Sequence, residues 1–113
     1  MDTINIKFAR QFTRKPGPRK IEEGDNSGEL YRKQLLILVK QAIDEDKKLI
    51  IDLDGVLGYG TSFLEEMFGG LIRNNHIPYE QLSKRLSFIS YEEPFLIDDI
   101  NKYLQRASQW EKL

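Results

Sequence analysis

Two aspartates separated by one residue have the clearest chemical potential in this sequence. Asp52 and Asp54 follow an apolar run at residues 49–53 and precede a turn with glycines at positions 55, 58 and 60. Carboxylates at this spacing are suited to a nucleophile working beside a general acid or base. They are equally suited to accepting hydrogen bonds from the amides of a glycine-rich turn. We favour this structural role.

The first of these readings rests on a family likeness. The segment Asp52-Leu53-Asp54-Gly55-Val56 resembles the first motif of haloacid-dehalogenase phosphatases, in which one aspartate is the nucleophile and the next is a general acid or base. That family normally places the motif on its first strand, with far more chain after it, whereas only 59 residues follow Asp54 here. A second acidic pair, Asp98 and Asp99, falls in the apolar stripe of the last expected helix. A phosphate-ester hydrolase using Asp52 and Asp54 therefore remains the alternative to a protein without catalytic activity.

Two hydroxyl side chains, Thr61 and Ser62, stand where the apolar strand gives way to a helix. Ser62 with Glu65 has the spacing of a capping box, so we expect Ser62 to be the N-cap of the helix. Replacing Ser62 should then cost about 1 kcal/mol of stability through the lost cap. Thr61 is then left facing outward, more exposed than Ser62. Either hydroxyl is also a candidate phosphoacceptor.

A basic segment with two prolines and several glycines covers residues 10–25, and the first 20 residues carry a net charge of +5. Arg14 and Arg19 flank a Pro-Gly-Pro turn, and arginine is the better side chain for forked contacts to carboxylate or phosphate. We expect these two arginines to converge near the helix start at Ser27 as an anion-binding site. A sensor of a small anion or nucleotide is thus a further alternative.

Composition excludes several classes of protein. The chain has 113 residues, enough for one domain, and no cysteine, which rules out thiolate nucleophiles, iron–sulfur clusters and zinc–cysteine sites. A single histidine rules out a multi-histidine metal site, and no metal or cofactor is expected. The net charge of −1 gives the protein no overall attraction for nucleic acid, and no nucleic-acid partner is expected. No apolar run approaches the roughly 20 residues of a membrane span, so a cytoplasmic protein is expected.

Hydrophobic periodicity indicates how these residues are positioned. Apolar alternation predicts strands around residues 4–8, 49–53 and 86–90, and helical spacing predicts helices that begin at Asn26 or Ser27, at Ser62 and at Pro94. The glycine pair Gly69–Gly70 lies inside the second of these helices, which predicts close packing there. Strands that alternate with helices predict an α/β domain with a small, mostly parallel sheet.

Three stretches together resemble a known family. They are FTRKPGPR at 12–19, GDNSGE at 24–29 and DLDGVLGYGTSFLEEMFGGL at 52–71. The sequence is similar to the STAS-like domain of unknown function, a bacterial and phage family related to anti-sigma factor antagonists. The resemblance implies a STAS-type α/β fold over residues 1–113 and a regulatory role in binding a protein partner, such as a histidine-kinase-like ATPase or anti-sigma factor.

The resemblance also implies a position for regulation. In the better-known relatives a serine at the start of the helix after the central strand is phosphorylated, and Thr61 falls at that position with Ser62 next to it. Their Asp-Ser-Ser-Gly signature is replaced here by Gly60-Thr61-Ser62-Phe63. We expect the turn formed by Gly58, Tyr59, Gly60 and Thr61 to belong to a partner-docking surface.

Overall fold

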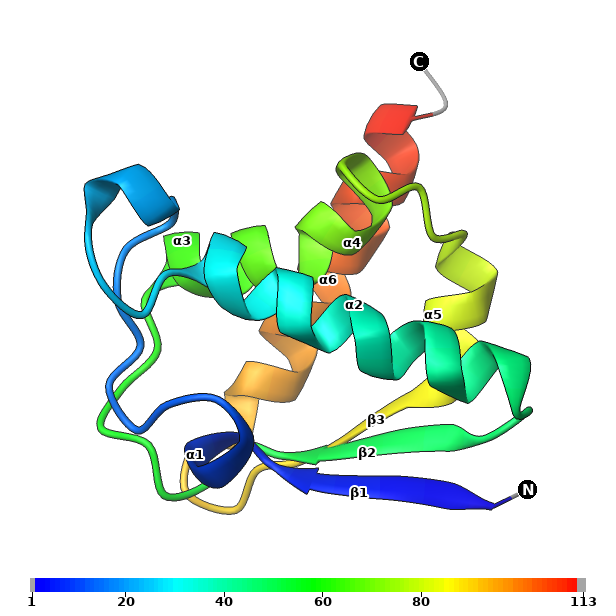
Figure 1. The fold of residues 1–113 in the computed structure, drawn as a ribbon, viewed down its shortest axis with the longest axis horizontal. Coiled ribbons are helices and arrows are strands. Elements are labelled where there is room, and N and C mark those ends of the chain that lie inside the picture. The colour runs from blue at the N-terminus through cyan, green and yellow to red at the C-terminus, as the bar shows by residue number, and fades with distance from the viewer. Residues whose placement is uncertain (1, 112–113) are drawn as a thin grey trace.

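Three parallel strands form the sheet, in the order β1 (Thr3–Lys7), β2 (Lys48–Asp52) and β3 (Leu86–Ile89). The computed structural model describes residues 2–111, and the ribbon is shown in Figure 1. In the register of the sheet, Leu49 of β2 pairs with Ile4 on one side and with Leu86 on the other. The expectation of an α/β domain with a small parallel sheet is confirmed.

Helices connect the strands and follow the last of them. The short α1 (Phe8–Gln11) and the 3-10 turn η1 (Ile21–Glu23) precede α2 (Gly28–Asp44), which leads into β2. After β2 comes one continuous helical segment made of α3 (Thr61–Leu64), the π-helical turn η2 (Glu65–Gly69) and α4 (Gly70–Arg73). The chain then forms α5 (Tyr79–Arg85), β3 and α6 (Phe95–Glu111). None of the helices described within residues 2–111 has the length and apolar character that crossing a membrane requires.

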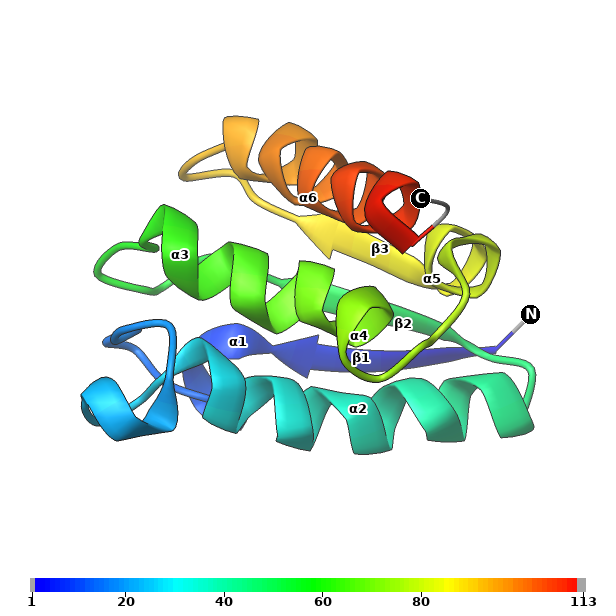
Figure 2. The same cartoon turned by 90° about the horizontal axis from the view of Figure 1, so that it is seen from above.

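The long helices cover one face of the sheet. Figure 1 shows α2, α4 and α6 on the same side of the three strands, and Figure 2 shows them lying side by side across the sheet. The opposite face carries a shallow depression of about 240 Å³ bordered by Asn5, Lys7, Ile50, Asp52 and Ile89. Parallel sheets are usually covered on both faces, so this uncovered face is an unusual feature of the domain.

The core lies between the sheet and the helical layer. Leu49 and Ile51 of the central strand are completely buried, while Lys48 is exposed, as expected for a strand whose alternate residues face the helices. The apolar stripe predicted for the helix after Ser62 is buried throughout: Phe63, Leu64, Met67, Phe68, Leu71 and Ile72. Phe8 is also completely buried, although it begins α1 and does not extend the first strand.

The start of α2 confirms one of the two predicted caps. The Ser27 hydroxyl accepts a hydrogen bond from the Leu30 amide at 3.0 Å. Asn26 has a left-handed backbone with φ of 56°, and its side chain accepts instead from the Tyr31 hydroxyl. The carboxylate of Glu29, in the first turn of α2, accepts from the Ile21 amide and so joins the helix to the basic segment.

The predicted capping box at Ser62 and Glu65 is wrong. The N-cap of α3 is Gly60, which has no side chain to cap the helix, and Ser62 lies inside the first turn with its side chain exposed. Glu65 does not reach back to the helix start because it pairs with Arg19 and Arg73, two cations brought in from other segments. Charged partners distant in sequence therefore override the local capping pattern.

Candidate functional site

The loops after β2 and β3 meet at the carboxyl end of the sheet and form a surface that we call the strand-end rim, residues 53–62 and 90–95. The carboxylate of Asp54 accepts hydrogen bonds from the amides of Tyr91 and Glu92, at 3.2 and 3.0 Å. In return the Gly55 amide donates to the Glu92 side chain at 2.9 Å. These three hydrogen bonds join the two loops into one surface. In parallel α/β folds this end of the sheet is where ligands usually bind.

The two aspartates have the structural role that the sequence favoured. Asp52 accepts from the Asp54 amide at 3.0 Å, and Asp54 holds the neighbouring loop as described above. Asp98 and Asp99 lie within α6, as their place in an apolar stripe indicated. Within residues 2–111 no group of three or more histidine, aspartate or glutamate side chains is placed to hold a metal ion.

Large apolar side chains are exposed on the strand-end rim. Leu57 is 72% exposed, Tyr91 is 82% exposed and Phe95 is 58% exposed. They make up half of the six large hydrophobic side chains that are exposed among the described residues; the others are Ile21, Ile37 and Trp110. The loops that carry Leu57 and Tyr91 are joined by the hydrogen bonds of Asp54, and exposed aromatic and aliphatic side chains are common in sites that bind another protein.

The turn that the sequence assigned to docking is only partly available for it. The Tyr59 ring is half-buried and packs edge-to-face against Phe8 with ring centroids 5.0 Å apart, while its hydroxyl donates to the Leu53 carbonyl at 2.8 Å. Burial, followed by the charge of nearby carboxylates, raises the pKa of Tyr59 well above its usual value. Tyr59 thus supports the loop from within and does not present its ring to a partner.

The residues around Tyr59 are open. A methyl group placed on Gly58 or Gly60 would meet no atom within 4 Å. The side chains of Thr61 and Ser62 are both exposed, so the structure leaves both hydroxyls accessible. Gly58, Gly60 and Thr61 therefore remain part of the candidate docking surface.

Two of the three residues of the predicted anion site, Arg19 and Ser27, have partners within the fold. The Arg19 guanidinium lies 2.5 Å from a carboxylate oxygen of Glu65, and the Ser27 hydroxyl is used as the cap of α2. The side chain of Arg14 is exposed, and its backbone carbonyl accepts from the Leu57 amide at 3.0 Å. The basic segment thus contacts the strand-end rim through its backbone and the long helical segment through Arg19.

Arg19 belongs to a set of ionised side chains that we call the charged cluster: Arg19, Lys20, Arg32, Glu65, Glu66 and Arg73. Its centre is Glu66, which is only 1% exposed and pairs with Arg32, itself 6% exposed. Lys20, Arg19 and Arg73 lie 3.3, 3.4 and 3.6 Å from the other Glu66 oxygen. Four cations thus surround two carboxylates, and the buried Glu66 contacts all four of the cations.

The glycine pair in the middle of the helical segment makes room for this cluster. A methyl group on Gly70 would lie 2.8 Å from a side-chain carbon of Arg32, and one on Gly69 would lie 2.5 Å from a Glu65 oxygen. The prediction of close packing at these glycines is confirmed. The π-helical turn η2 carries both glutamates, and such turns are frequent at functional sites.

Ionisation in the charged cluster follows from its surroundings. Burial alone would raise the pKa of the Glu65 carboxyl, but hydrogen bonds from Arg73 and Arg19 outweigh burial, and the pKa is lowered. Burial lowers the pKa of Arg32, although the charge of Glu29 opposes this effect. Sequence reasoning missed Glu66, yet a signal was present. Glu66 follows Phe63 by three residues and therefore sits on the same apolar stripe.

A comparison with protein families assigns the chain. The model of the family described as a STAS-like domain of unknown function matches residues 29–95, and the chain belongs to that family. The matched region runs from the first turn of α2 to the first residue of α6, and it includes β2, β3 and the whole strand-end rim. No curated protein matches the chain, and no solved structure matches it.

Proposed function

We propose that this STAS-like domain is a non-catalytic regulatory module that binds a protein partner through the strand-end rim. The observation that carries the proposal is the exposure of Leu57 and Tyr91 on two loops that hydrogen bonds join, and of Phe95 at the start of α6. Their burial against a partner would supply the main driving force for binding, because large apolar side chains dominate interface energetics.

The commitment of the two aspartates supports a binding role over a hydrolytic one. Asp54 accepts from two loop amides and Asp52 accepts from a third, so both carboxylates stabilise the shape of the rim. A carboxylate that fixes the shape of a loop through such bonds has a structural role that requires no catalysis. Magnesium-dependent turnover of a generic phosphate ester that is lost in Asp52→Asn would overturn this part of the proposal.

The partner class that we propose is a histidine-kinase-like ATPase or an anti-sigma factor, on the strength of the family's relation to anti-sigma factor antagonists. Thr61 is the proposed phosphoacceptor, with Ser62 as its alternative, because both hydroxyls are exposed at the start of α3. A phosphate there would add about −1.5 to −2 charge close to the positive end of a helix. Glu65 would repel this phosphate less than an unpaired carboxylate would, because Arg19 and Arg73 form ion pairs with it.

A sensor of a small anion is the second candidate, and the charged cluster is the observation that favours it. The cluster contains two more positive than negative side chains, and Arg19, Lys20 and Arg73 are each about one-third exposed, at 33%, 38% and 31%. Titration with inorganic phosphate would test this candidate, with a rise in melting temperature that is lost in Lys20→Ala as the supporting result.

Affinity purification from the native host, carried out in parallel with matched variants, tests the main proposal. Leu57→Asp and Tyr91→Asp each place a charge on the strand-end rim, whereas Ile37→Asp places the same charge on α2, where Ile37 is 70% exposed. We expect the wild type and Ile37→Asp to retain the same partner and both rim variants to lose it. Retention of that partner by both rim variants would place the binding surface elsewhere.

A further inference from the structure

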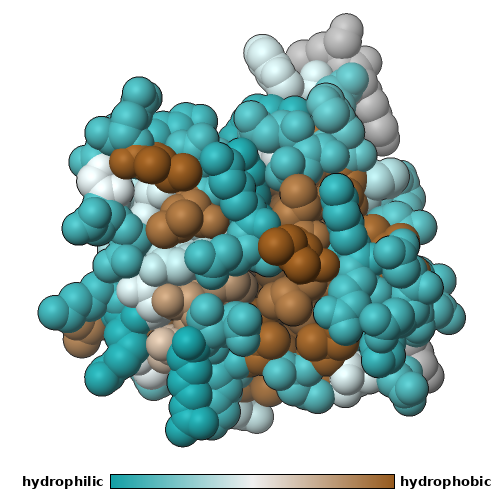
Figure 3. Space-filling model, viewed as in Figure 1, coloured by the Kyte–Doolittle hydropathy of each residue, from teal (hydrophilic) through white to brown (hydrophobic). Residues whose placement is uncertain are grey.

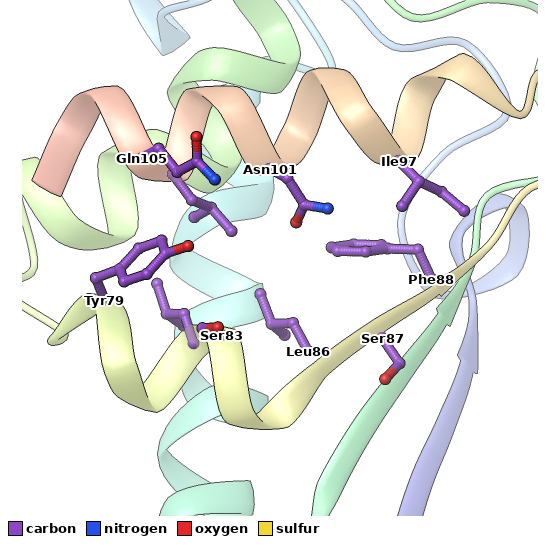
Figure 4. Close-up of a pocket in the computed structure, with 10 residues that line it drawn as sticks. Tyr79, Ser83, Leu86, Ser87, Phe88, Ile97, Asn101 and Gln105 are labelled. Atoms are coloured by element: carbon purple, nitrogen blue, oxygen red, sulfur yellow. The ribbon is translucent and has the colours of Figure 1, made fainter.

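The free edge of β3 borders a groove of about 430 Å³. Figure 4 shows this groove between α6 on one side and α5 with β3 on the other. The amide of Asn101 and the hydroxyl of Tyr79 point into it. The residues that line it are Tyr79, Leu82, Ser83, Leu86, Ser87, Phe88, Ile97, Asn101, Leu104 and Gln105.

The backbone of β3 offers hydrogen-bonding groups at this edge. The Ile89 carbonyl accepts from the Leu53 amide at 2.8 Å, so the backbone groups of Ile89 point toward the chain segment of β2. Neighbouring residues of a parallel strand direct their backbone groups to opposite sides. The N–H and C=O of Phe88 therefore point away from β2, to the edge where the described part of the chain places no further strand.

Helix α6 provides a cover for an added strand. Figure 2 shows α6 on the far side of β3 from β2, so the helix overhangs the free edge. A segment paired with β3 would thus have Asn101 and Gln105 of α6 above it, and its side chains on that face would enter the groove beside Phe88 and Ile97. Such pairing, in which the main chain supplies affinity and pockets select alternate side chains, is a recurrent mode of peptide recognition.

The chemistry of the lining selects the kind of segment. None of the ten lining residues is an aspartate, glutamate, lysine or arginine, although such residues make up 31% of the sequence. A charged side chain entering the groove would lose water without gaining an ionic partner. The strand β3 itself contains no charged residue and no proline, two features that often prevent strand addition.

We propose that the groove binds an extended, uncharged segment of a partner protein, which pairs with the Phe88 backbone as a fourth strand beneath α6. This site is separate from the strand-end rim, and it does not depend on the function proposed for the rim. The bound segment extends the sheet, so its affinity depends on its own backbone amides as well as on its side chains.

Selection from a random heptapeptide library displayed on phage, with the whole chain as bait, provides the probe. We expect the recovered peptides to lack charged residues. A synthetic copy of a recovered peptide is then titrated by fluorescence anisotropy against the wild type, Asn101→Arg and Gln34→Arg. Asn101 and Gln34 are both exposed helical residues, on α6 and α2, and only Asn101 lines the groove.

Binding should weaken by about tenfold or more in Asn101→Arg, because the longer, charged side chain occupies the groove. Binding should stay unchanged in Gln34→Arg. Methylating alternate backbone nitrogens of the peptide should weaken binding by about tenfold or more, as expected from the loss of one or two hydrogen bonds. The proposal is overturned if no peptide is recovered, if charged peptides predominate, or if N-methylation has no effect. Sedimentation showing a dimer that Asn101→Arg dissociates would make the occupant a second copy of the chain and would also overturn it.

Discussion

Replacing Glu66 by leucine should destabilise the fold by about 3–5 kcal/mol, the cost of leaving a buried charge without its partner. Glu66 is 1% exposed, and Arg32 opposite it is 6% exposed, so water cannot take the place of the lost carboxylate. The Nε of Arg32 already has no hydrogen-bond partner among the described residues. The guanidinium in Glu66→Leu would therefore be both buried and largely unpaired.

Replacing the partner Arg32 should reduce stability less, because the Glu66 carboxylate keeps its ion pairs with other cations. In Arg32→Met, Lys20 remains 3.3 Å from a Glu66 oxygen and Arg19 remains 3.4 Å from it. We expect a loss of about 1–3 kcal/mol, the range for one charge-assisted hydrogen bond. The double variant, in which two apolar side chains face each other, should be more stable than Glu66→Leu alone.

Urea denaturation monitored by circular dichroism measures the free energies of unfolding of Glu66→Leu, Arg32→Met and the double variant. A double-mutant cycle then gives the coupling between the two positions. The reasoning is refuted if Glu66→Leu costs no more than Arg32→Met, or if the double variant is less stable than both single variants. A gentler replacement, Glu66→Gln, keeps the shape of the side chain and should fall between the wild type and Glu66→Leu.

Three further predictions concern other parts of the helical layer. Ser27→Ala should lose about 1 kcal/mol of stability with the cap of α2, whereas Ser62→Ala should be nearly neutral, as judged by urea denaturation. Gly70→Ala should cost about 1–3 kcal/mol, since the added methyl would lie 2.8 Å from a side-chain carbon of Arg32. The pKa of Glu65 is lower in the folded state, so its contribution to stability is complete above the unfolded pKa and is lost as the pH falls through the folded value. Glu65→Gln should flatten this acid dependence in thermal melts recorded across the pH range below 5.

Controls separate these effects from general damage to the fold. Gly58→Ala should change stability little, because a methyl group there meets no atom within 4 Å and the backbone φ is not positive. Equal losses in Gly70→Ala and Gly58→Ala would contradict the account of the close packing at Arg32. An acid dependence that is unchanged in Glu65→Gln would mean that other carboxylates set it.

The sequence was informative wherever apolar side chains recur with one period. Leu49 and Ile51 alternate within a short apolar run, and the structure has β2 there with both side chains buried. The start of α2 at Ser27 was also visible, because an N-cap depends on local backbone preferences. These features need no knowledge of what lies across the fold.

The charged cluster could not be predicted in the same way, because it depends on partners far apart in sequence. Glu66 and Arg32 are separated by 34 positions, and their pairing requires α2 and η2 to lie against each other. The same limitation made Glu65 look like part of a local capping box, although its partners are Arg19 and Arg73. A charged residue on an apolar stripe, such as Glu66, is the sequence signal for a buried ion pair.

The turn after β2 was predicted from the sequence, but which side chains it exposes was not. The sequence placed a docking surface at Gly58, Tyr59, Gly60 and Thr61 because the turn follows a buried strand. The structure buries half of Tyr59 against Phe8 and exposes Tyr91 on the neighbouring loop. Which of two tyrosines faces outward depends on how the loops pack, and that is fixed by the hydrogen bonds of Asp54.

Calorimetric titration of the purified partner into the wild type, Tyr91→Asp and Ile37→Asp tests the proposed binding role most directly. The account predicts that Tyr91→Asp weakens binding by about 2 kcal/mol or more, the size expected for a central aromatic side chain of an interface. It also predicts that Ile37→Asp, with the same charge on an equally exposed apolar position of α2, binds as the wild type does. Binding of Tyr91→Asp with wild-type affinity would contradict the assignment of the strand-end rim as the docking surface.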